Sequence, residues 1–185
     1  MPARRRLYAG VANHQSALDP IVVASLLRRD FTVVAKKEAR FDPRAVLGSA
    51  VLDPVYVDRG DSERARASLA AVADRIRSGT SLVIFPEGTR SVTPTLGPFK
   101  KGAFRLAAAT GAPVVPIVLH DTGEVLPKHG RAIRPGVVRV DVLEPRYDWT
   151  ADGLHEQIDD LHEEYRRVLA AGGVEDAGAL RGERT

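Results

Sequence analysis

A histidine and an aspartate stand five residues apart near the start of the chain, in the stretch NHQSALDP (13–20). A carboxylate that accepts a hydrogen bond from one ring nitrogen orients an imidazole and supports the charge it gains, which leaves the other nitrogen free to take a proton. Asp19 can therefore make His14 a general base toward the hydroxyl of a bound substrate. Ser16 is not expected to be a covalent nucleophile, because it lacks the Gly-x-Ser-x-Gly surroundings of one.

The spacing alone is weak evidence, because His155 and Asp160 share it. That second pair falls within a predicted helix, where five residues of separation turn the side chains roughly 140° apart around the axis. His14 instead ends an apolar strand and Asp19-Pro20 opens a helix, so the intervening turn can bring the carboxylate back to the ring. The alternative is that Asp19 only caps the helix and that His14 is a polar residue at a strand end.

A second segment, FPEGTRS (85–91), has the composition of an anion-binding turn. Pro86 ends a buried strand at the edge where α/β folds bind their ligands. Gly88 lets backbone amides approach an anion, Thr89 adds a hydroxyl, and Arg90 adds a bidentate donor suited to phosphate. The alternative is an ordinary Pro-Gly turn with surface charges.

Three more charged residues are expected at this edge. Glu87 would repel a phosphate, so we expect it to hold Arg90 or to bind a substrate hydroxyl. Lys36 ends one predicted strand and Arg59 follows another. A single Lys or Arg is more often a solvated surface charge, but several at the ends of successive strands indicate a basic pocket.

The elements that must position these residues follow an α/β pattern. Apolar runs rich in Val and Ile alternate with helical patterns, which predicts a mixed, largely parallel sheet flanked by helices. The predicted strands are 6–12, 31–36, 54–57, 81–85, 113–119 and 136–143. The predicted helices are 20–29, 43–50, 62–78, 101–110 and about 151–170.

The last predicted helix carries an apolar stripe that should pack on the body of the protein. The stripe consists of Leu154, Ile158, Leu161, Tyr165 and Val168. A length of 185 residues fits one domain, which we expect to cover residues 1–170. Residues 171–185 are rich in Gly, Ala and charge, and we expect them to form a disordered tail. The segment 93–98, rich in Thr, Pro and Gly, indicates a mobile loop.

The charge of the chain is unevenly distributed. Residues 1–140 contain 22 Lys and Arg against 12 Asp and Glu, whereas residues 141–185 contain 5 against 12. A basic body is expected to attract phosphates, anionic lipid head groups or an acidic protein. Nucleic acid is not an expected partner, because only 5% of the residues are aromatic and no run of Lys and Arg is interleaved with stacking residues.

Composition excludes several further classes. The chain has no cysteine, which excludes disulfides, thiolate metal sites and a cysteine nucleophile, and we expect no metal. No signal peptide is indicated, because the apolar stretch near the N-terminus is short. The longest apolar run, Val114 to Leu119, is far below the roughly 20 residues needed to cross a bilayer. We therefore expect a cytoplasmic protein.

Four blocks of the sequence resemble, in order, the motifs of the glycerolipid acyltransferase family. NHQSALDP (13–20) is similar to the catalytic His-x4-Asp motif and VYVDR (55–59) to the second motif. FPEGTRS (85–91) is similar to the third motif and VPI (115–117) to the fourth. Four blocks in the family's order make the resemblance specific over about residues 7–145.

The resemblance implies transfer of a fatty acyl group to the free hydroxyl of lysophosphatidate, which gives phosphatidate. The donor would be acyl-coenzyme A or acyl carrier protein, with no bound cofactor. By this resemblance His14 is the base and Asp19 orients it, while Pro116 belongs to the wall on the acyl side. The residues that would bind the glycerol phosphate are Lys36, Arg59, Glu87, Gly88, Thr89 and Arg90.

The resemblance leaves alternatives open. Family members often carry apolar helices ahead of the first motif, so this chain is either a shortened member or one domain of a larger protein. Membrane contact is then expected to be peripheral, at an anionic inner face, through the basic surface and the apolar side of helix 20–29. Other lysophospholipids or glycerol 3-phosphate could replace lysophosphatidate as acceptor. A non-catalytic domain that binds anionic lipid, or a hydrolase, would also fit these residues.

Overall fold

A computed structural model of the chain describes residues 8–27, 31–37, 54–57, 70 and 72–179. Six strands form one sheet in the order β3-β2-β4-β1-β5-β6. The strands are β1 (Ala9–Ala12), β2 (Phe31–Lys36), β3 (Val55–Val57), β4 (Ser81–Ile84), β5 (Val114–Leu119) and β6 (Val140–Val142). The helices are α1 (Asp19–Leu26), α4 (Gly102–Thr110), α5 (Thr122–Val125) and α6 (Leu154–Ala179).

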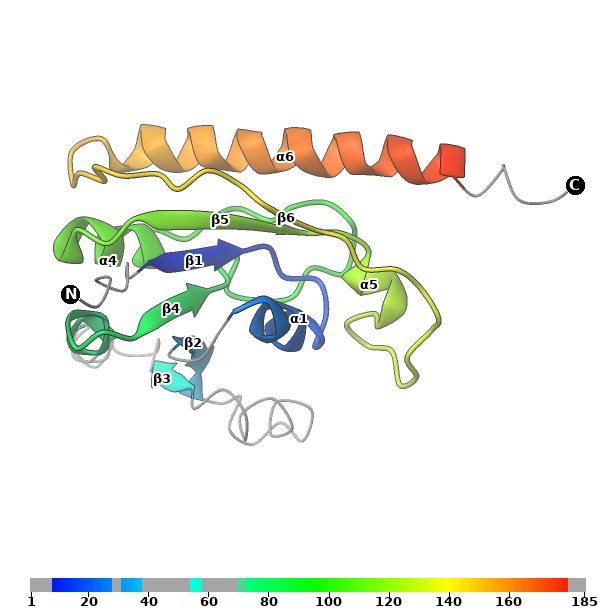
Figure 1. The fold of residues 1–185 in the computed structure, drawn as a ribbon, viewed down its shortest axis with the longest axis horizontal. Coiled ribbons are helices and arrows are strands. Elements are labelled where there is room, and N and C mark those ends of the chain that lie inside the picture. The colour runs from blue at the N-terminus through cyan, green and yellow to red at the C-terminus, as the bar shows by residue number, and fades with distance from the viewer. Residues whose placement is uncertain (1–7, 28–30, 38–53, 58–69, 71, 180–185) are drawn as a thin grey trace, which may run out of the picture.

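The sheet is mixed and largely parallel, which confirms the predicted fold class. Among the described strands only the pair of β5 and β6 is antiparallel, and the other neighbouring strands run in the same direction. β1 lies between β4 and β5. Because β1 and β4 are parallel neighbours, the segments that follow them leave the sheet at the same edge (Figure 1). These segments begin with Asn13 and Phe85.

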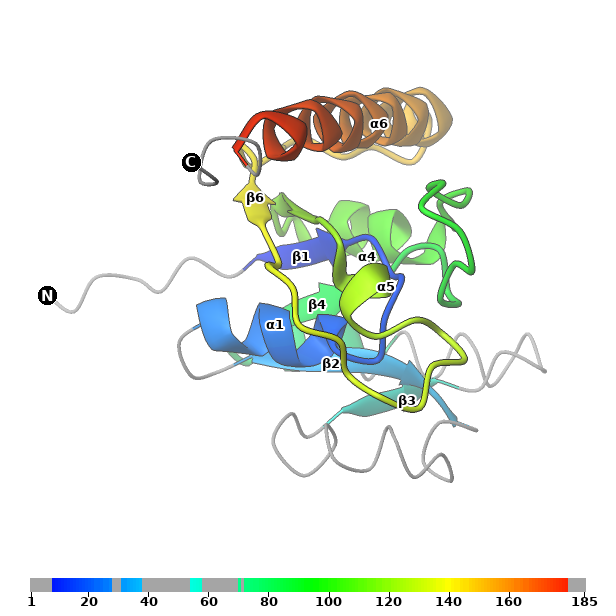
Figure 2. The same ribbon diagram turned by 90° about the vertical axis from the view of Figure 1, so that its right-hand side faces the viewer.

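Helices cover both faces of the sheet. Figure 2 shows α1 on one side of the sheet and α4 and α6 on the other. The alternation of side chains along β1 fits this arrangement, because Val11 packs with the cluster under α4 and α6 while Ala12 packs with the cluster under α1. Val23 is the buried residue of α1 in that second cluster. Val11 and Ala12 are both fully buried.

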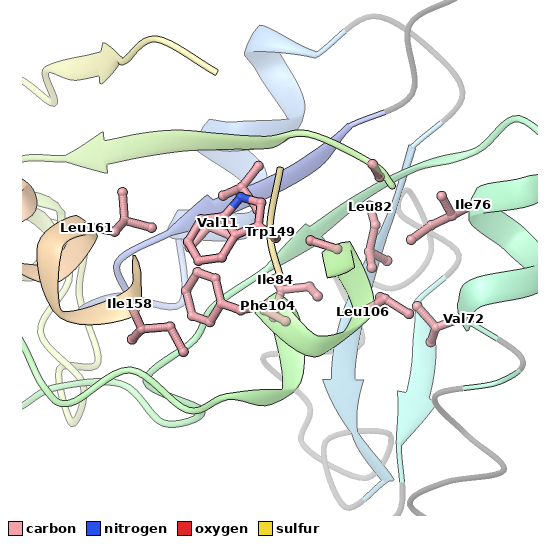
Figure 3. Close-up of a cluster of buried hydrophobic side chains, with 14 of the residues drawn as sticks. Val11, Val72, Ile76, Leu82, Ile84, Phe104, Leu106, Trp149, Ile158 and Leu161 are labelled. Carbon is pink, nitrogen blue, oxygen red and sulfur yellow. The ribbon is translucent and has the colours of Figure 1, made fainter. Parts of the chain in front are cut away.

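The larger core lies between the sheet, α4 and α6. Figure 3 shows Val11 and Ile84 from the sheet facing Phe104 of α4, with Ile158 and Leu161 of α6 beside them. The predicted apolar stripe of the last helix therefore does pack on the body. Burial of large apolar side chains at roughly 1.5–3 kcal/mol each makes this contact the main reason that α6 stays on the sheet.

Several predicted boundaries differ from the structure. α6 continues to Ala179 instead of ending near residue 170, so part of the predicted tail is helical. Gly172 lies inside this helix, at a position where a Cβ atom would meet the side chains of Arg139 and His120. The short helix α5 was not predicted. The helix predicted at 43–50 lies outside the described residues.

Of the helix predicted at 62–78, residues 70 and 72–77 are described and are helical. The strands are in general shorter than predicted, and β6 in particular covers only Val140–Val142. In the part of the chain that the structure describes, no helix has both the length and the apolar character required to cross a membrane.

Candidate active site

His14 and Asp19 meet at the end of β1. The His14 Nδ1 atom lies 2.7 Å from the Asp19 Oδ2 atom, so the turn between β1 and α1 brings the carboxylate to the ring as predicted. The Nε2 atom of His14 has no hydrogen-bond partner among the described residues, and 17% of the side chain is exposed. This geometry leaves one ring nitrogen accessible to a substrate hydroxyl while the other is held by a carboxylate.

Asp19 serves the turn rather than the helix. Its Oδ2 atom also accepts hydrogen bonds from the backbone N–H groups of Gln15 at 2.7 Å and Ser16 at 2.8 Å. The side chain is fully buried, and Oδ1 has no hydrogen-bond partner among the described residues. The N-cap position of α1 is Leu18, with no capping side-chain hydrogen bond. The alternative that Asp19 is only a helix cap is therefore not what the structure shows.

Three further contacts hold the ring and the backbone of His14. The imidazole stacks on the ring of Phe85 with centroids 4.3 Å apart. The backbone N–H of His14 donates to Glu87 Oε1 at 2.7 Å, and its carbonyl accepts from the backbone N–H of Ser91 at 2.8 Å. The segment that follows β4 therefore holds the backbone of His14 on both sides.

Glu87 is buried and binds two backbone N–H groups. It is 5% exposed, and its second oxygen, Oε2, accepts the backbone N–H of Gly97 at 2.9 Å. Burial raises the pKa of the Glu87 carboxyl above its usual value, and the two backbone N–H donors partly oppose that rise. We expected Glu87 to contact Arg90 or the substrate. In the structure its oxygens accept the N–H groups of His14 and Gly97, so it supports the backbone of His14, and the contact with a substrate hydroxyl stays a prediction.

Gly97 is the residue that makes this support possible. A Cβ atom at position 97 would lie 2.8 Å from Glu87 Oε2, so any larger residue would displace the carboxylate. The surrounding segment, predicted as a mobile loop, is tied down at several points. The backbone N–H of Lys100 donates to the Pro86 carbonyl, and the Gln15 side-chain amide donates to the Pro94 carbonyl.

The predicted anion-binding turn lies beside the histidine. Gly88 has a φ of +70°, a conformation that favours glycine, and its N–H donates to the Phe85 carbonyl. Thr89 is exposed and Arg90 is half-buried. The link from Ser91 to the carbonyl of His14 brings this turn next to the histidine, as the anion-site interpretation requires.

The remaining predicted site residues fall in three different places. Lys36 ends β2, at the edge of the sheet that carries His14. Arg59 lies outside the described residues. Pro116 is buried inside β5 opposite Val11, so it occupies the sheet itself.

An apolar cavity of about 240 Å³ lies beside the site. Its walls include Val34, Val57, Ile84 and Leu106, and Phe85 and Pro86 also line it. Because Phe85 stacks on His14, the cavity adjoins the histidine through that ring.

A second, more polar pocket of about 370 Å³ flanks the other side of the first motif. It is lined by Gln15 and Ser91 near the histidine and by Lys128 and Arg134 after α5, together with the acidic Asp121 and Glu124. Cations and acids therefore face the same space. In the described part of the chain no group of three or more His, Asp or Glu side chains could hold a metal ion.

A second histidine–aspartate contact was missed. His120 follows β5 and is almost fully buried, and its Nε2 atom lies 2.8 Å from Asp141 Oδ2. The partners are far apart in sequence, so no local spacing could have indicated the pair. By contrast, exposed His155 lies 3.6 Å from Asp159 rather than pairing with Asp160.

Comparison with known proteins shows the family of the chain. A family model described as Acyltransferase matches residues 6–120, which include all four motif blocks. A chloroplastic 1-acyl-sn-glycerol-3-phosphate acyltransferase of Brassica napus is 39% identical over 145 residues, covering 78% of this chain and 42% of the relative. The 1-acyl-sn-glycerol-3-phosphate acyltransferase of Saccharomyces cerevisiae is 34% identical over 145 residues, covering 76% and 48%.

A solved structure is similar over nearly the whole chain. The crystal structure of the 1-acyl-sn-glycerophosphate acyltransferase PlsC from Thermotoga maritima matches with a TM-score of 0.70 and 26% identity, covering 97% of this chain and 68% of that one. The chain spans about half the length of the curated relatives it matches. The family match, the motif order and the His14–Asp19 geometry agree, and the chain belongs to the acyltransferase family.

Proposed function

We propose that this chain transfers a fatty acyl group from a thioester donor to the free hydroxyl of lysophosphatidate, which gives phosphatidate. The observation that carries the proposal is the contact between His14 Nδ1 and Asp19 Oδ2, with Nε2 left accessible. In the reaction the oxygen of the acceptor hydroxyl attacks the thioester carbonyl, and Nε2 of His14 takes the proton of that hydroxyl. The thiolate then leaves and takes that proton from the imidazolium.

The acceptor phosphate would be held by the turn that follows β4. Gly88 supplies a left-handed backbone position, exposed Thr89 a hydroxyl, and Arg90 a guanidinium. Lys36 and Arg59, at the ends of β2 and β3 in sequence, are proposed to add positive charge. Glu87 belongs to the support of His14 and not to the phosphate site.

The acyl chain would enter the apolar cavity next to Phe85. Its lining by Val34, Ile84 and Leu106 suits a hydrocarbon chain, and the stacking of Phe85 on His14 supports a thioester end near the histidine. The donor is proposed to be acyl-coenzyme A or acyl carrier protein. The lining of this cavity makes it a better acyl wall than Pro116, which lies within the sheet.

We further propose peripheral contact with an anionic membrane at the cytoplasmic inner face. The sequence between Glu124 and Asp141 contains no acidic residue. This segment exposes Ile133 by 67% and Val137 by 81%, and the exposed Arg131 and Arg134 flank them. Exposed apolar side chains next to cations are what an interfacial contact with anionic lipid uses.

The experiment that tests the activity crosses two donors with several acceptors. Purified protein is given acyl-coenzyme A or acylated carrier protein, and lysophosphatidate, another lysophospholipid or glycerol 3-phosphate. Mass spectrometry identifies the product. We expect phosphatidate with at least one donor. A different acylated product would show that another acceptor is the substrate. Release of free thiol without any acceptor would indicate a hydrolase.

Vesicle binding tests the membrane contact separately. Binding to vesicles that contain phosphatidylglycerol should weaken strongly when Arg131 and Arg134 are both changed to Glu. The matched control changes exposed Arg166 and Arg167 of α6 to Glu and should bind like the unmodified protein. Equal weakening of vesicle binding in both variants would contradict the proposed contact through Arg131 and Arg134. Vesicle binding by a protein that shows no turnover with any donor would favour a lipid-binding domain.

A further inference from the structure

The contact between β1 and β5, called the seam below, includes side-chain hydrogen bonds in place of ladder bonds just before His14. The register pairs Val11 with Pro116 and Ala12 with Ile117. In a regular parallel ladder this register directs the Ile117 N–H at the Val11 carbonyl. Here the Tyr165 hydroxyl lies between them. It accepts the Ile117 N–H at 3.0 Å and donates to the Val11 carbonyl.

The next ladder position is also closed by a side chain. The Asn13 amide accepts the Leu119 N–H at 2.7 Å and donates to the Leu119 carbonyl at 2.9 Å. The backbone of Leu119 is thereby bound by the side chain of Asn13. The chain can then turn toward β4, where the N–H of His14 donates to Glu87. The direction in which β1 ends is therefore set by a tyrosine hydroxyl and an asparagine amide.

Tyr165 is built into this position from α6. The whole residue is fully buried, and Phe99 packs edge-on against its ring with centroids 5.2 Å apart. Burial raises the pKa of the Tyr165 hydroxyl far above its ordinary value, so the group stays protonated. A neutral hydroxyl is required at this point, because it must donate one hydrogen bond and accept another.

A second residue of α6, His162, contacts the loop at Gly97 that holds Glu87 against the backbone of His14. The His162 Nε2 atom lies 3.0 Å from the Gly97 carbonyl. The Gly97 N–H in turn donates to Glu87 Oε2, and Glu87 Oε1 accepts the N–H of His14. Phe99 also packs against the His162 ring, with centroids 4.9 Å apart. Residues 162 and 165 lie about one turn apart on the same side of the helix.

We propose that α6 positions the catalytic histidine, with Tyr165 and His162 as the positioning residues. Tyr165 sets where β1 leaves the sheet, and His162 fixes the loop that holds Glu87 against the backbone of His14. Neither side chain contacts the substrate in this scheme. The inference rests on the proposed function in one respect, because its test measures the turnover of acyl transfer.

The test compares kcat and KM of Tyr165→Phe with those of the unmodified protein. Loss of the hydroxyl lets the seam close or leaves two backbone groups without partners, and either change moves the end of β1. A displacement of the base by a fraction of an ångström should lower kcat by about tenfold, since a 1 Å misplacement costs about 100-fold. The KM values for donor and acceptor should change less than twofold by the same reasoning, because neither binding site includes Tyr165.

A matched control separates positioning from stability. Ile158→Ala removes core packing on the same buried stripe of α6, and the Ile158 side chain has no polar atom with which to join the hydrogen bonds between β1 and β5. We expect it to lower Tm at least as much as Tyr165→Phe while kcat, measured well below both melting temperatures, stays within twofold of normal. Equal kcat losses in the two variants, or a normal kcat in Tyr165→Phe, would overturn the proposal.

The role of His162 is tested independently, by asking whether a conservative substitution restores the kcat that His162→Ala loses. His162→Ala should lower kcat, and His162→Gln should restore most of it, because a glutamine amide can donate to the Gly97 carbonyl. Equal kcat in the two variants would overturn the role of His162. If the unmodified protein shows no acyl transfer with any donor, the proposed function fails instead. The positioning claim is then tested by the His14 ring NMR signals, which Tyr165→Phe should shift and Ile158→Ala should not.

Discussion

The carboxylate of Asp19 shows how one residue can combine charge with geometry. A single oxygen, Oδ2, meets the His14 ring and two backbone N–H groups, while Oδ1 has no hydrogen-bond partner among the described residues. An asparagine can therefore place its oxygen where Oδ2 lies and its amide nitrogen where Oδ1 lies. The shape of the turn would be kept and the negative charge removed.

Asp19→Asn is accordingly expected to keep the shape of the turn, at a cost of about 1–3 kcal/mol for its buried and unpaired amide N–H groups, and to lose activity. The neutral amide cannot stabilise the imidazolium that forms as the hydroxyl is deprotonated, so kcat should fall by about 10²–10⁴. KM for the acceptor should change little. Steady-state kinetics and a circular dichroism melt check both parts. Near-normal kcat in a folded Asp19→Asn protein would contradict the role of the charge.

Glu87 leads to a prediction about pH. Its raised pKa means that the folded protein binds more protons than the unfolded chain between the ordinary value of 4.5 and the folded value. Glu87 therefore contributes a free energy of unfolding that falls as pH rises through this window. Glu87→Gln lacks that contribution, but its amide leaves His14 or Gly97 without an acceptor, at a cost of about 1–3 kcal/mol.

Urea unfolding of both proteins between pH 4 and pH 8 measures this effect. The advantage of the unmodified protein over Glu87→Gln should shrink as the pH rises from about 4.5, and should then become constant once Glu87 is ionised in both states. An advantage that grows with pH would show that the carboxylate is stabilised in the folded protein, opposite to the stated direction. Glu87→Gln should also lower kcat, because either the N–H of His14 itself or the N–H of Gly97, which holds the side chain in place, loses its acceptor.

At the scale of elements, the sequence was informative where local pattern decides structure. The strands β2, β4 and β5 and the turns after β1 and β4 were predicted because each depends on a short apolar run and a breaking residue. Contacts made across the fold were not predictable. Tyr165 was assigned to an apolar stripe, and only the register of β1 and β5 shows that its hydroxyl enters the sheet.

The C-terminal half of α6 offers a prediction in which two effects oppose each other. Ala is favoured over Gly in a helix by about 1 kcal/mol. At position 172, however, a Cβ would lie 1.8 Å from Arg139 Nη2 and 2.6 Å from His120 Cε1. The Arg139 side chain can move, but the His120 ring is buried and held by Asp141.

Gly172→Ala should therefore destabilise the protein despite the better helix propensity. Overpacking of this kind costs about 1–3 kcal/mol, which should lower Tm by several degrees. Differential scanning calorimetry measures the change. His120→Ala in the same background opens space for the new methyl group, so it should reduce the penalty of Gly172→Ala. An increase in Tm for Gly172→Ala alone would contradict this packing.

At the scale of the whole molecule, the site is assembled from distant parts of the chain. The segment after β1 supplies His14, the segment after β4 supplies Glu87 and the anion turn, and α6 supplies Tyr165 and His162. The first two were indicated by local motifs, whereas the contribution of α6 depends on contacts across most of the chain. The direction of Glu87 was likewise set by Gly97, whose importance no local pattern indicated.

The central claim is that His14 is the base of acyl transfer, and His14→Ala tests it most directly. The chain supplies a matched control in His155→Ala, which removes an exposed histidine with the same sequence spacing to an aspartate. Initial rates of phosphatidate formation are compared for both variants, with circular dichroism as the check on folding. We predict a loss of at least about 10³-fold in His14→Ala and a normal rate in His155→Ala. A folded His14→Ala protein that retains acyl transfer near the normal rate would contradict the account.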